Sequence, residues 1–367
     1  MEKYRILTIN PGSTSTKIAL FDNEKLIFKE NLTHEAGTLA KFKTISEQLP
    51  YRTEMVLEAL KNNNVKLETI DAFSGRGGGL VSLKGGTYNI NKLLLEHARI
   101  GYTMQHASVL GPQIAYDLAQ RNNKKCFVVN PVNVDEKEEI TRITGIKGIY
   151  NESMFHALNQ KETAYKYAKS INKKYEDLNL IVVHMGGGIS IGAHKKGRVV
   201  DVNNASEGDG PFTPTRSGSI PAGSLVNLCY SGKYTKQEMK DLVSKKGGLV
   251  SLLGTSDAIE VKKMIRNGNE FAKLVYDSMI YQIAKAIGAY SVILKGDVQA
   301  IILTGGIAND KELVGALQDY VSYIGKVIVI PGEEEMEALA NGTLRVLTGE
   351  EKALEYTGKP VWQEKTE

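Results

Sequence analysis

The sequence predicts an α/β fold built from two copies of one domain plan, and three observations support this. The chain has 367 residues, which is long for one domain. Short apolar runs alternate with amphipathic helical patterns, as in α/β proteins. The order strand, small-residue loop, strand, turn, strand occurs twice, and a shift of 174 residues aligns Ile9 with Val183, Gly12 with Gly186 and Ala19 with Ala193.

The strands of each copy are apolar runs that end at Gly, hydroxyl or charged residues. The first copy is predicted as strands 5–9, 18–21 and 26–28 with a loop at 10–17. The second is predicted as strands 178–183, 189–193 and 198–202 with a loop at 184–188. Two further strands, 70–73 and 127–129, precede the second copy, and strand 300–303 follows it, ending in a third glycine turn at 304–309.

The helices are predicted from apolar residues at three-and-four spacing. They are expected at 51–62, 154–170, 236–244, 270–294, 311–321 and 334–347, with a last strand at 327–330. No low-complexity linker separates the copies, so the domain boundary is expected at a hinge of ordinary composition. We expect an N-terminal domain of 1–140 plus about 335–367 and a C-terminal domain of 141–334.

Composition excludes several classes of protein. Lys plus Arg exceed Asp plus Glu by 46 − 42 = 4, and no basic block suggests nucleic-acid binding. No apolar run is long enough for a membrane span, and no signal peptide is recognised at the N-terminus. Cys126 and Cys229 are expected to be reduced. These features predict a cytoplasmic protein that binds neither nucleic acid nor membrane.

Several common motifs are absent from the sequence. It contains no G-x-x-x-x-G-K-[ST], and Gly75, Gly77 and Gly79 do not have the spacing of G-x-G-x-x-G. H-E-x-x-H, C-x-x-C and G-x-S-x-G are missing as well. The chain is therefore not expected to be a P-loop NTPase, a zincin or an α/β-hydrolase.

Two loops at corresponding places of the two copies suit phosphate. Residues 10–17 combine an amide, glycine, hydroxyls and Lys17, so that backbone N–H groups can approach an anion. In the second loop three glycines follow His184, which could donate to a phosphoryl oxygen. Each loop alone could be a hairpin turn, but their duplication favours phosphate.

Two arginines and an acidic pair are further candidates. Arg76 and Arg216 lie among glycines and small residues, where a guanidinium is free to meet a carboxylate or phosphate with two parallel hydrogen bonds. Asp135 and Glu136 follow strand 127–129 and could hold a metal or orient a substrate. The alternative for each is a solvated loop side chain.

Three motifs resemble those of the acetate and butyrate kinases. ILTINPGSTSTK at 6–17 resembles their first phosphate motif, HMGGGIS at 184–190 the second, and LTGGI at 303–307 the adenosine motif. The resemblance runs in order from residue 4 to about residue 348. It implies two duplicated ribonuclease-H-like domains flanking a nucleotide cleft, as in sugar kinases, actin and chaperone ATPases. Because water in an open cleft could compete with the carboxylate for the γ-phosphate, we expect the domains to close when both substrates are bound.

Further segments resemble the butyrate branch. They are NPVNVDE at 130–136, SMFHALNQK at 153–161 and PGEEEMEALA at 331–340. Acetate kinases carry Asn-Gly-Ser in the second loop, where this chain has Gly187-Gly188-Ile189. Asn130 stands where Asp is expected in a butyrate kinase.

The resemblance implies catalytic roles for four residues. Arg76 would hold the substrate carboxylate, and Arg216 would reach the transferring phosphoryl group. His184 would stabilise the charge of that group, and Asp135 resembles the active-site aspartate.

The resemblance also implies binding of ATP or ADP and Mg²⁺. The glutamate linked to magnesium would be Glu334, with Glu333 and Glu335 left open by the run of three glutamates. The nucleotide would contact Asn10, Gly12, Ser13, Ser15, Lys17, Gly186, Gly187, Gly188, Gly305, Gly306 and Ile307.

The function these features predict is reversible transfer of the ATP γ-phosphoryl group to the carboxylate of a short-chain fatty acid, butyrate or a branched four- or five-carbon acid. The alternatives are an acetate or propionate kinase, a sugar or polyol kinase with Asp135 as base, and an ATP-switched filament or chaperone. Val81 and Leu83 near Arg76 favour an apolar substrate tail over a sugar. A homodimer or higher homo-oligomer is expected from the family and from the apolar helix pattern at 270–294.

Overall fold

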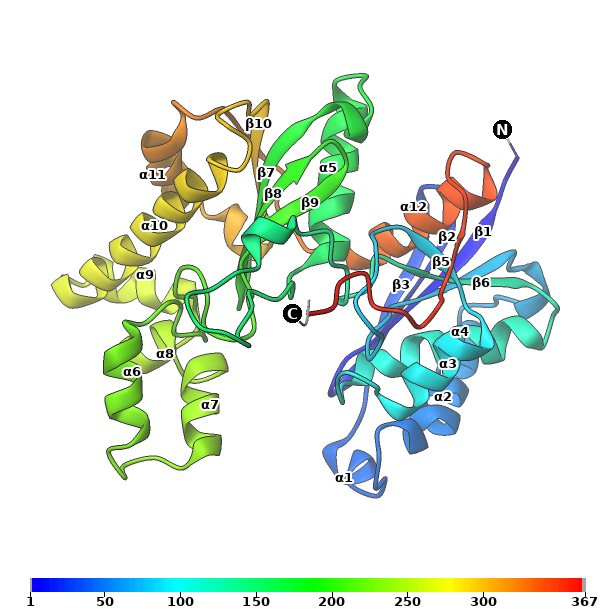
Figure 1. Cartoon of the computed structure of the whole chain (residues 1–367). Coiled ribbons are helices and arrows are strands. Elements are labelled where there is room, and N and C mark those ends of the chain that lie inside the picture. Colours follow the sequence, from blue (N-terminus) through cyan, green and yellow to red (C-terminus); the bar gives the residue numbers. More distant parts are fainter. Residues whose placement is uncertain (1, 365–367) are drawn as a thin grey trace. The chain divides into compact units, whose positions relative to one another are not determined.

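Two units of the chain each contain a β-sheet of their own (Figure 1). The computed structural model describes residues 2–364. Unit 1 comprises residues up to Asp135, then Ala157–Glu162, and those from Glu334 onward. Unit 2 comprises Glu136–His156 and Thr163–Glu333. The chain thus passes from unit to unit after Asp135 and after Glu333, and the first turns of one helix, Ala157–Glu162, belong to unit 1.

The sheet of unit 1 has the strand order β12-β5-β6-β4-β1-β2-β3 among the described residues. Its strands are β1 (Arg5–Pro11), β2 (Ser15–Asp22), β3 (Lys25–Thr33), β4 (Ala72–Gly75), β5 (Thr87–Asn89), β6 (Lys125–Val129) and β12 (Leu354–Glu355). Its helices are α1 (Ala36–Leu39), α2 (Leu49–Asn62), α3 (Lys92–Ile100), α4 (Leu110–Gln120) and α12 (Glu335–Leu347).

Alternation of side chains along the strands places the helices of unit 1 on its two faces (Figure 1). Ile6 of β1 and Ala19 and Phe21 of β2 pack against Met336 and Ala340 of α12. Helix α4 packs on the other face against β1, β4 and β6, with α2 and α3 beside it. The face of α12 is therefore the one on which every second residue from Ile6 points.

The sheet of unit 2 has the order β11-β10-β7-β8-β9 among the described residues. Its strands are β7 (Asn179–Met185), β8 (Ile189–Lys195), β9 (Arg198–Val202), β10 (Ala300–Thr304) and β11 (Lys326–Val329). The helices are α5 (Ala157–Ser170), α6 (Ala222–Cys229), α7 (Lys236–Ser244), α8 (Gly248–Leu253), α9 (Ala258–Arg266), α10 (Glu270–Ser291) and α11 (Lys311–Val321).

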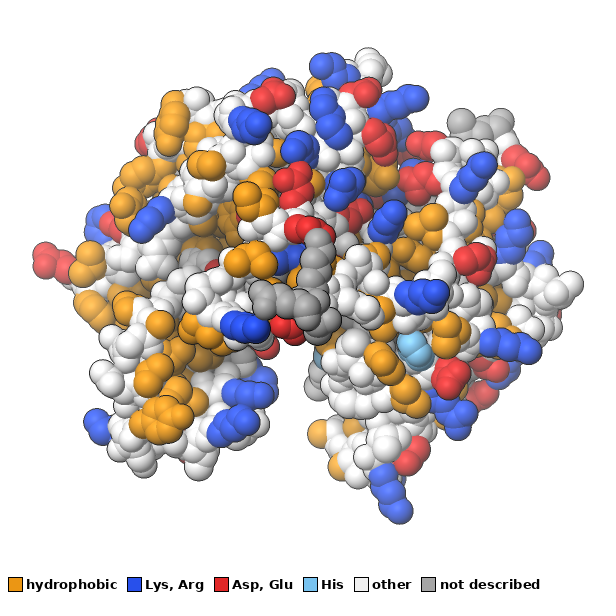
Figure 2. All heavy atoms as spheres, in the orientation of Figure 1, with side chains coloured by type: hydrophobic (Ala, Val, Ile, Leu, Met, Phe, Trp, Pro, Cys, Tyr) orange, Lys and Arg blue, Asp and Glu red, His pale blue; other side chains and the backbone are white. Residues whose placement is uncertain are grey.

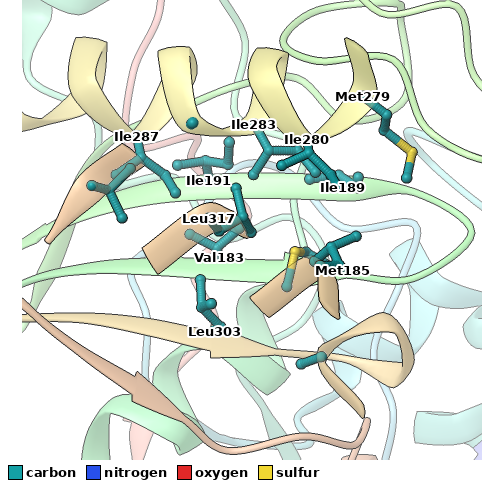
Figure 3. Packing of buried hydrophobic residues seen from close by; sticks show 14 of the residues in the cluster. Val183, Met185, Ile189, Ile191, Met279, Ile280, Ile283, Ile287, Leu303 and Leu317 are labelled. Carbon is teal, nitrogen blue, oxygen red and sulfur yellow. The ribbon is translucent and has the colours of Figure 1, made fainter. Parts of the chain in front are cut away.

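The core of unit 2 lies on both faces of this sheet. On one face α10 contributes an apolar stripe, and Figure 3 shows Met279, Ile283 and Ile287 of this helix over Val183 and Ile191. Such a stripe at helical spacing is what an amphipathic core helix requires. On the other face, side chains of α5 pack against the alternate residues of β7 and β10: Ala164, Tyr167, Ala168, Leu180, Val182, Ala300 and Ile302.

The predicted duplication is present in both sheets. In unit 1 the strands β3-β2-β1-β4-β6 follow one another, and in unit 2 the strands β9-β8-β7-β10-β11 do. In each unit the first three strands are antiparallel, and the fourth and fifth join in parallel. The two halves share one strand order, as expected of the duplicated ribonuclease-H-like fold that the resemblance implied.

The predicted shift of 174 is right for the first strand but wrong for the second. Strand β1 begins at Arg5 and β7 at Asn179, which keeps that shift. Thr8, however, pairs with Ala19, whereas its counterpart Val182 pairs with Gly192. The second strands are therefore related by 173 residues, because the loop after β7 is one residue shorter. Ala19 corresponds to Gly192, not to Ala193.

Most predicted elements are confirmed, with four changes. The predicted loop at 10–17 is shorter, because strand β1 extends to Pro11 and strand β2 begins at Ser15. His184 lies in strand β7 and not in a loop, since it pairs with Ser190. Helix α5 begins at Ala157 instead of Met154, because Met154 accepts a hydrogen bond from Ala205 outside any helix. Helix α10 ends at Ser291. Both cysteines are free, and no helix within residues 2–364 has the length and apolarity that a membrane span requires.

Candidate active site

The first predicted loop presents Asn10 and Lys17 on the α12 face of unit 1. The two residues are directly opposite each other in the β1–β2 ladder, so their side chains share a face. That face is the one of Ile6 and α12, because Asn10 lies four residues after Ile6. The buried Asn10 donates from Nδ2 to Oε2 of Glu335, 2.6 Å away, at the start of α12.

Arg76 is held beside Asn10 by the same glutamate. It follows β4, and its backbone N–H donates to the carbonyl of Ile9, 2.9 Å away. Its guanidinium forms an ion pair with the Glu335 carboxylate, and both side chains are about one fifth exposed. We call Asn10, Arg76 and Glu335 the unit 1 cluster. It brings together Asn10, which is predicted to contact phosphate, and Arg76, which is predicted to bind a substrate carboxylate. Arg76 already binds the carboxylate of Glu335.

The glycines around Arg76 leave its side chain free, and they are also required by the packing of the backbone. A methyl group on Gly75 would overlap the backbone of Gly111 in α4, and one on Gly111 would overlap the backbone of Arg76. The end of β4 and the first turn of α4 therefore touch backbone to backbone, which only glycine permits. This contact sets the position from which Arg76 reaches Glu335.

Strand β7 and the residue before α5 place a histidine pair on the α5 face of unit 2. His184 lies on the same side of β7 as Leu180 and Val182, which pack against α5. Its ring stacks on that of His156, the residue before α5, with centroids 3.8 Å apart and planes at 15°. His156 Nδ1 lies 2.8 Å from Ser190 Oγ, and Ser190 is opposite His184 in the ladder.

Arg216 packs against the glycines of this second loop. The hydroxyls of Thr213 and Thr215 donate to the Gly187 carbonyl at 2.7 and 3.0 Å, which ties the turn carrying Arg216 to the loop. The guanidinium lies against Gly188, where any side chain would overlap it. It also donates to the carbonyl of Ala205. Burial lowers the pKa of Arg216, but a guanidinium stays protonated near neutral pH. We call His156, His184, Ser190 and Arg216 the unit 2 cluster.

The third glycine turn contains one structural and one accessible glycine. Gly305 has φ of 87° and exchanges hydrogen bonds of 3.1 and 3.0 Å with Gly332. A methyl group on it would overlap the backbone of Met185. Gly306, in contrast, faces open space, and the following Ile307 is half-buried. An apolar, flat ligand surface could therefore contact Gly306 and Ile307.

The three glutamates of 333–335 lie in different surroundings. Glu335 belongs to the unit 1 cluster. A methyl group on Gly186 would lie 3.8 Å from Glu333 Oε1, so this carboxylate is beside the second loop of unit 2. Glu334 caps α12 with a left-handed backbone, φ 35°. No group of three His, Cys, Asp or Glu suited to a metal occurs in the described part of the chain. Mg²⁺ commonly needs only one or two carboxylates beside phosphates and water, so these glutamates fit it.

The remaining predicted residues are placed as follows. Asp135 is buried, and its backbone N–H donates to the Leu83 carbonyl, 2.8 Å away. Val81 and Leu83 are buried too. In the first loop Ser13 is exposed, whereas Gly12 and Ser15 are half-buried. Gly187 faces open space.

Four residues described here were not selected from the sequence. They are His156 and Ser190 of the unit 2 cluster, Glu335 as the partner of Arg76, and Arg52 behind the first loop. The signal for Arg52 was a charge on the apolar side of helix 51–62, and for His156 a lone histidine directly before a helix. Neither pattern reveals its partner, because the partners are far away in sequence.

Comparison with known proteins identifies the family. Residues 148–337 match the model of the acetokinase family. The structure is similar to that of acetate kinase from Porphyromonas gingivalis (TM-score 0.76, 20% identity, covering 93% of this chain and 99% of that one). It is also similar to a propionate kinase from Francisella tularensis subsp. tularensis SCHU S4 (0.74, 20%, 92% and 98%) and to acetate kinase from Entamoeba histolytica (0.74, 17%, 92% and 98%). These likenesses establish the two-unit α/β fold. Since the family model matches more than half of the sequence, the chain belongs to the acetokinase family.

Proposed function

We propose that this protein transfers the γ-phosphoryl group of ATP to the carboxylate of a short-chain fatty acid, with butyrate or a branched four- or five-carbon acid preferred. Membership of the acetokinase family supports a phosphotransferase with a carboxylate acceptor. The single observation that carries the proposal is Arg76, whose guanidinium already binds a carboxylate, that of Glu335. The butyrate-like segments at 130–136, 153–161 and 331–340 support the chain length.

A carboxylate needs no general base, because it is ionised near neutral pH. We propose in-line attack of a substrate oxygen on the γ-phosphorus: this O–P bond forms while the bond from phosphorus to the β,γ-bridging oxygen breaks, and ADP leaves. Catalysis then consists of alignment and neutralisation of charge. Arg76 holds and orients the acceptor, taking a substrate carboxylate in place of Glu335.

The unit 2 cluster suits the other part of the reaction. His184, oriented by the stack with His156, donates to a phosphoryl oxygen, and Arg216 supplies a fixed positive charge. The hydrogen bonds from Thr213 and Thr215 to the loop keep Arg216 in place. Glu334 is the proposed holder of Mg²⁺, with Glu333 next to it. Mg²⁺ bound with ATP would neutralise phosphate charge.

The second candidate is a kinase of acetate or propionate. The three solved structures named above carry those names. The preference for one acyl chain length depends on a few contacts between methylene groups and the pocket, each worth about 1–3 kcal/mol of discrimination. Only activity can therefore separate the two.

The test is ADP release with acetate, propionate, butyrate, isobutyrate, isovalerate and a panel of sugars. Acyl phosphate is trapped in parallel with hydroxylamine as the hydroxamate. We expect ADP and hydroxamate in equal amounts, with kcat/KM highest for a four- or five-carbon acid. Equal or higher kcat/KM for acetate would reject the butyrate preference, and ADP release with sugars alone would reject the carboxylate acceptor. The variant Arg216→Ala serves as the control, because it removes the positive charge that is proposed to act on the phosphoryl group during transfer.

A further inference from the structure

Behind the first loop of unit 1 lies a buried arginine that the proposed mechanism does not use. Arg52 of α2 is 1% exposed. It donates from Nη1 to the carbonyls of Gly12 and Ser15 at 2.9 and 3.1 Å, and from Nη2 to that of Ser13 at 3.5 Å. Its Nε and Nη2 donate to Gln48 Oε1 at 3.0 and 2.8 Å. All of these acceptors are neutral. No carboxylate among the described residues pairs with Arg52, so its charge is buried without a counter-ion.

The carbonyls that Arg52 binds determine where the loop amides point. In a trans peptide the C=O of one residue and the N–H of the next point in opposite directions. With the carbonyls of Gly12 and Ser13 turned toward Arg52, the N–H groups of Ser13 and Thr14 point away from it. Neither N–H donates to a protein group in the part of the chain that is described, and both residues are exposed. Two consecutive outward amides form a concave donor surface suited to an anion.

A chain of hydrogen-bonded neutral side chains helps to hold Arg52 in place. Arg52 Nη1 also donates to Thr16 Oγ1, 3.0 Å away. Thr16 Oγ1 lies 2.8 Å from His34 Nε2, and His34 Nδ1 lies 3.2 Å from the sulfur of Met55. Sulfur only accepts, so Nδ1 carries the proton of the neutral ring and Thr16 donates to Nε2. His34 thus adds no second charge beside Arg52.

We propose that Arg52 is a positioning residue that turns the 12–16 loop into a binding site for the phosphate oxygens of a nucleoside triphosphate. Its guanidinium fork holds the carbonyls inward, and its buried charge is balanced only when an anion binds on the outer side of the loop. The proposal rests on the proposed function in taking ATP as the anion. It assigns the support of this loop to a residue that does not itself touch the substrate.

The test compares full-length wild type with Arg52→Lys, Arg52→Gln and Thr16→Val. Lys61→Gln is the matched control, because it removes an exposed positive charge from the same helix. Arg52→Lys keeps the charge but loses the fork that binds several carbonyls at once. KM for ATP and KM for butyrate are measured separately. The second readout is the shift in thermal midpoint caused by tripolyphosphate, which needs no acceptor.

We expect Arg52→Lys to fold and to raise KM for ATP by about tenfold or more, with KM for butyrate changed by less than about threefold. The tripolyphosphate shift should be lost in Arg52→Gln, be reduced in Arg52→Lys and Thr16→Val, and stay at the wild-type size in Lys61→Gln. If Arg52→Gln does not fold, the other two variants still decide.

Two results would overturn the proposal. One is a folded Arg52→Lys with wild-type KM for ATP and a wild-type tripolyphosphate shift. The other is a lower midpoint for the variants with no change in the shift, which shows a purely structural role. Failure of the proposed function is distinguishable: wild type would then respond to tripolyphosphate but release no ADP with any carboxylate.

Discussion

Arg76 and Glu335 are 259 residues apart in sequence, yet they form one ion pair beside Asn10. A carboxylate from the protein itself thus occupies the guanidinium that we assign to the substrate. Under the proposed function an acid substrate would compete with this internal partner, so its affinity would report the difference between two similar ion pairs. This gives Arg76 an energetic role that differs from that of Arg216, whose neighbours are carbonyls and glycines.

Arg76→Ala should raise KM for butyrate by on the order of 10²-fold, because two charge-assisted hydrogen bonds to the acceptor are lost. KM for ATP should change much less. Steady-state kinetics with each substrate varied in turn measure both values. Arg99→Ala, which removes an exposed arginine of the same unit, is the control. A defect confined to KM for ATP would contradict the assignment.

His34 makes stability depend on pH. Burial, and then the charge of Arg52, lower the pKa of His34 from 6.5 to about 4. The unfolded chain therefore binds a proton between these values while the folded chain does not. The free energy of unfolding carries no penalty from His34 above the unfolded pKa, and it falls as the pH drops from about 6.5 toward 4. By linkage the loss amounts to about 2 kcal/mol at pH 5.

The measurement is urea unfolding of wild type and His34→Gln at pH 7.5 and pH 5.0. All other titrating groups are common to both proteins, so the difference between the two pH effects isolates His34. We expect wild type to lose about 2 kcal/mol more than the variant over this interval. An equal loss in both proteins would show that His34 does not titrate in this way.

At the scale of elements, duplication explains why the two clusters are alike. Asn10 of β1 and His184 of β7 are related by the shift of 174 that the first strands keep. Each lies on the face covered by a helix, α12 or α5, and contacts the residue at that helix's start, Glu335 or His156. A strand end beside a helix start is therefore the repeated unit on which each half builds its polar cluster.

Asp310 is the connection between three helices of unit 2. As N-cap of α11 it accepts from the N–H groups of Glu312 and Leu313. It also accepts from Lys262 of α9 at 2.7 Å and from Tyr276 of α10 at 2.6 Å. These contacts lower the pKa of Asp310 despite its burial, so its charged form is the one that stabilises the fold.

Asp310→Ala should lower the free energy of unfolding by about 2–4 kcal/mol, combining the loss of a cap with the loss of a charged acceptor. Asp310→Asn keeps the capping oxygen and should cost less. Thermal and urea unfolding measure the effect, with Asp319→Ala on the exposed side of α11 as control. Destabilisation by Asp310→Ala no larger than that of the control would refute this role.

At the scale of the whole molecule, α10 carries an apolar stripe that the described residues do not cover. Phe271, Leu274 and Tyr281 are 55%, 62% and 53% exposed. Figure 2 shows hydrophobic side chains gathered over the helical part of unit 2. Exposed apolar surface of this kind commonly marks an interface between proteins. The opposite side of the same helix packs the core, so both faces of α10 are apolar.

We predict that two copies of the chain associate through this stripe. Sedimentation at micromolar concentration should give about twice the 40.2 kDa chain mass. Leu274→Glu should shift the protein toward monomer, because a charge would be buried without a partner. Lys311→Glu, which changes an exposed charge on α11, should leave the mass unchanged. A wild-type monomer would refute the prediction.

Local patterns predicted most of the sheet strands and six helices, but not α1, α3, α4, α6, α8, α9, β5 or β12. Apolar runs predicted β1, β2, β7, β8 and β10, and helical spacing predicted α2, α7, α10 and α11, because burial of one helix face is periodic along the chain. The ends of the elements were predicted less accurately. His184 was expected in a loop since it borders three glycines, but ladder pairing with Ser190 keeps it in the strand.

By itself the sequence determined that this is a duplicated α/β protein, that polar loops follow its strands, and that Arg76 and Arg216 lie among the glycines and small residues of loops. Only the tertiary structure decided that Glu335 binds Arg76, that His156 stacks on His184, and that Arg52 supports the first loop from inside. The physical reason is that periodicity reports which residues are buried, whereas the partner of a buried charge depends on which distant segments the packed sheet brings together.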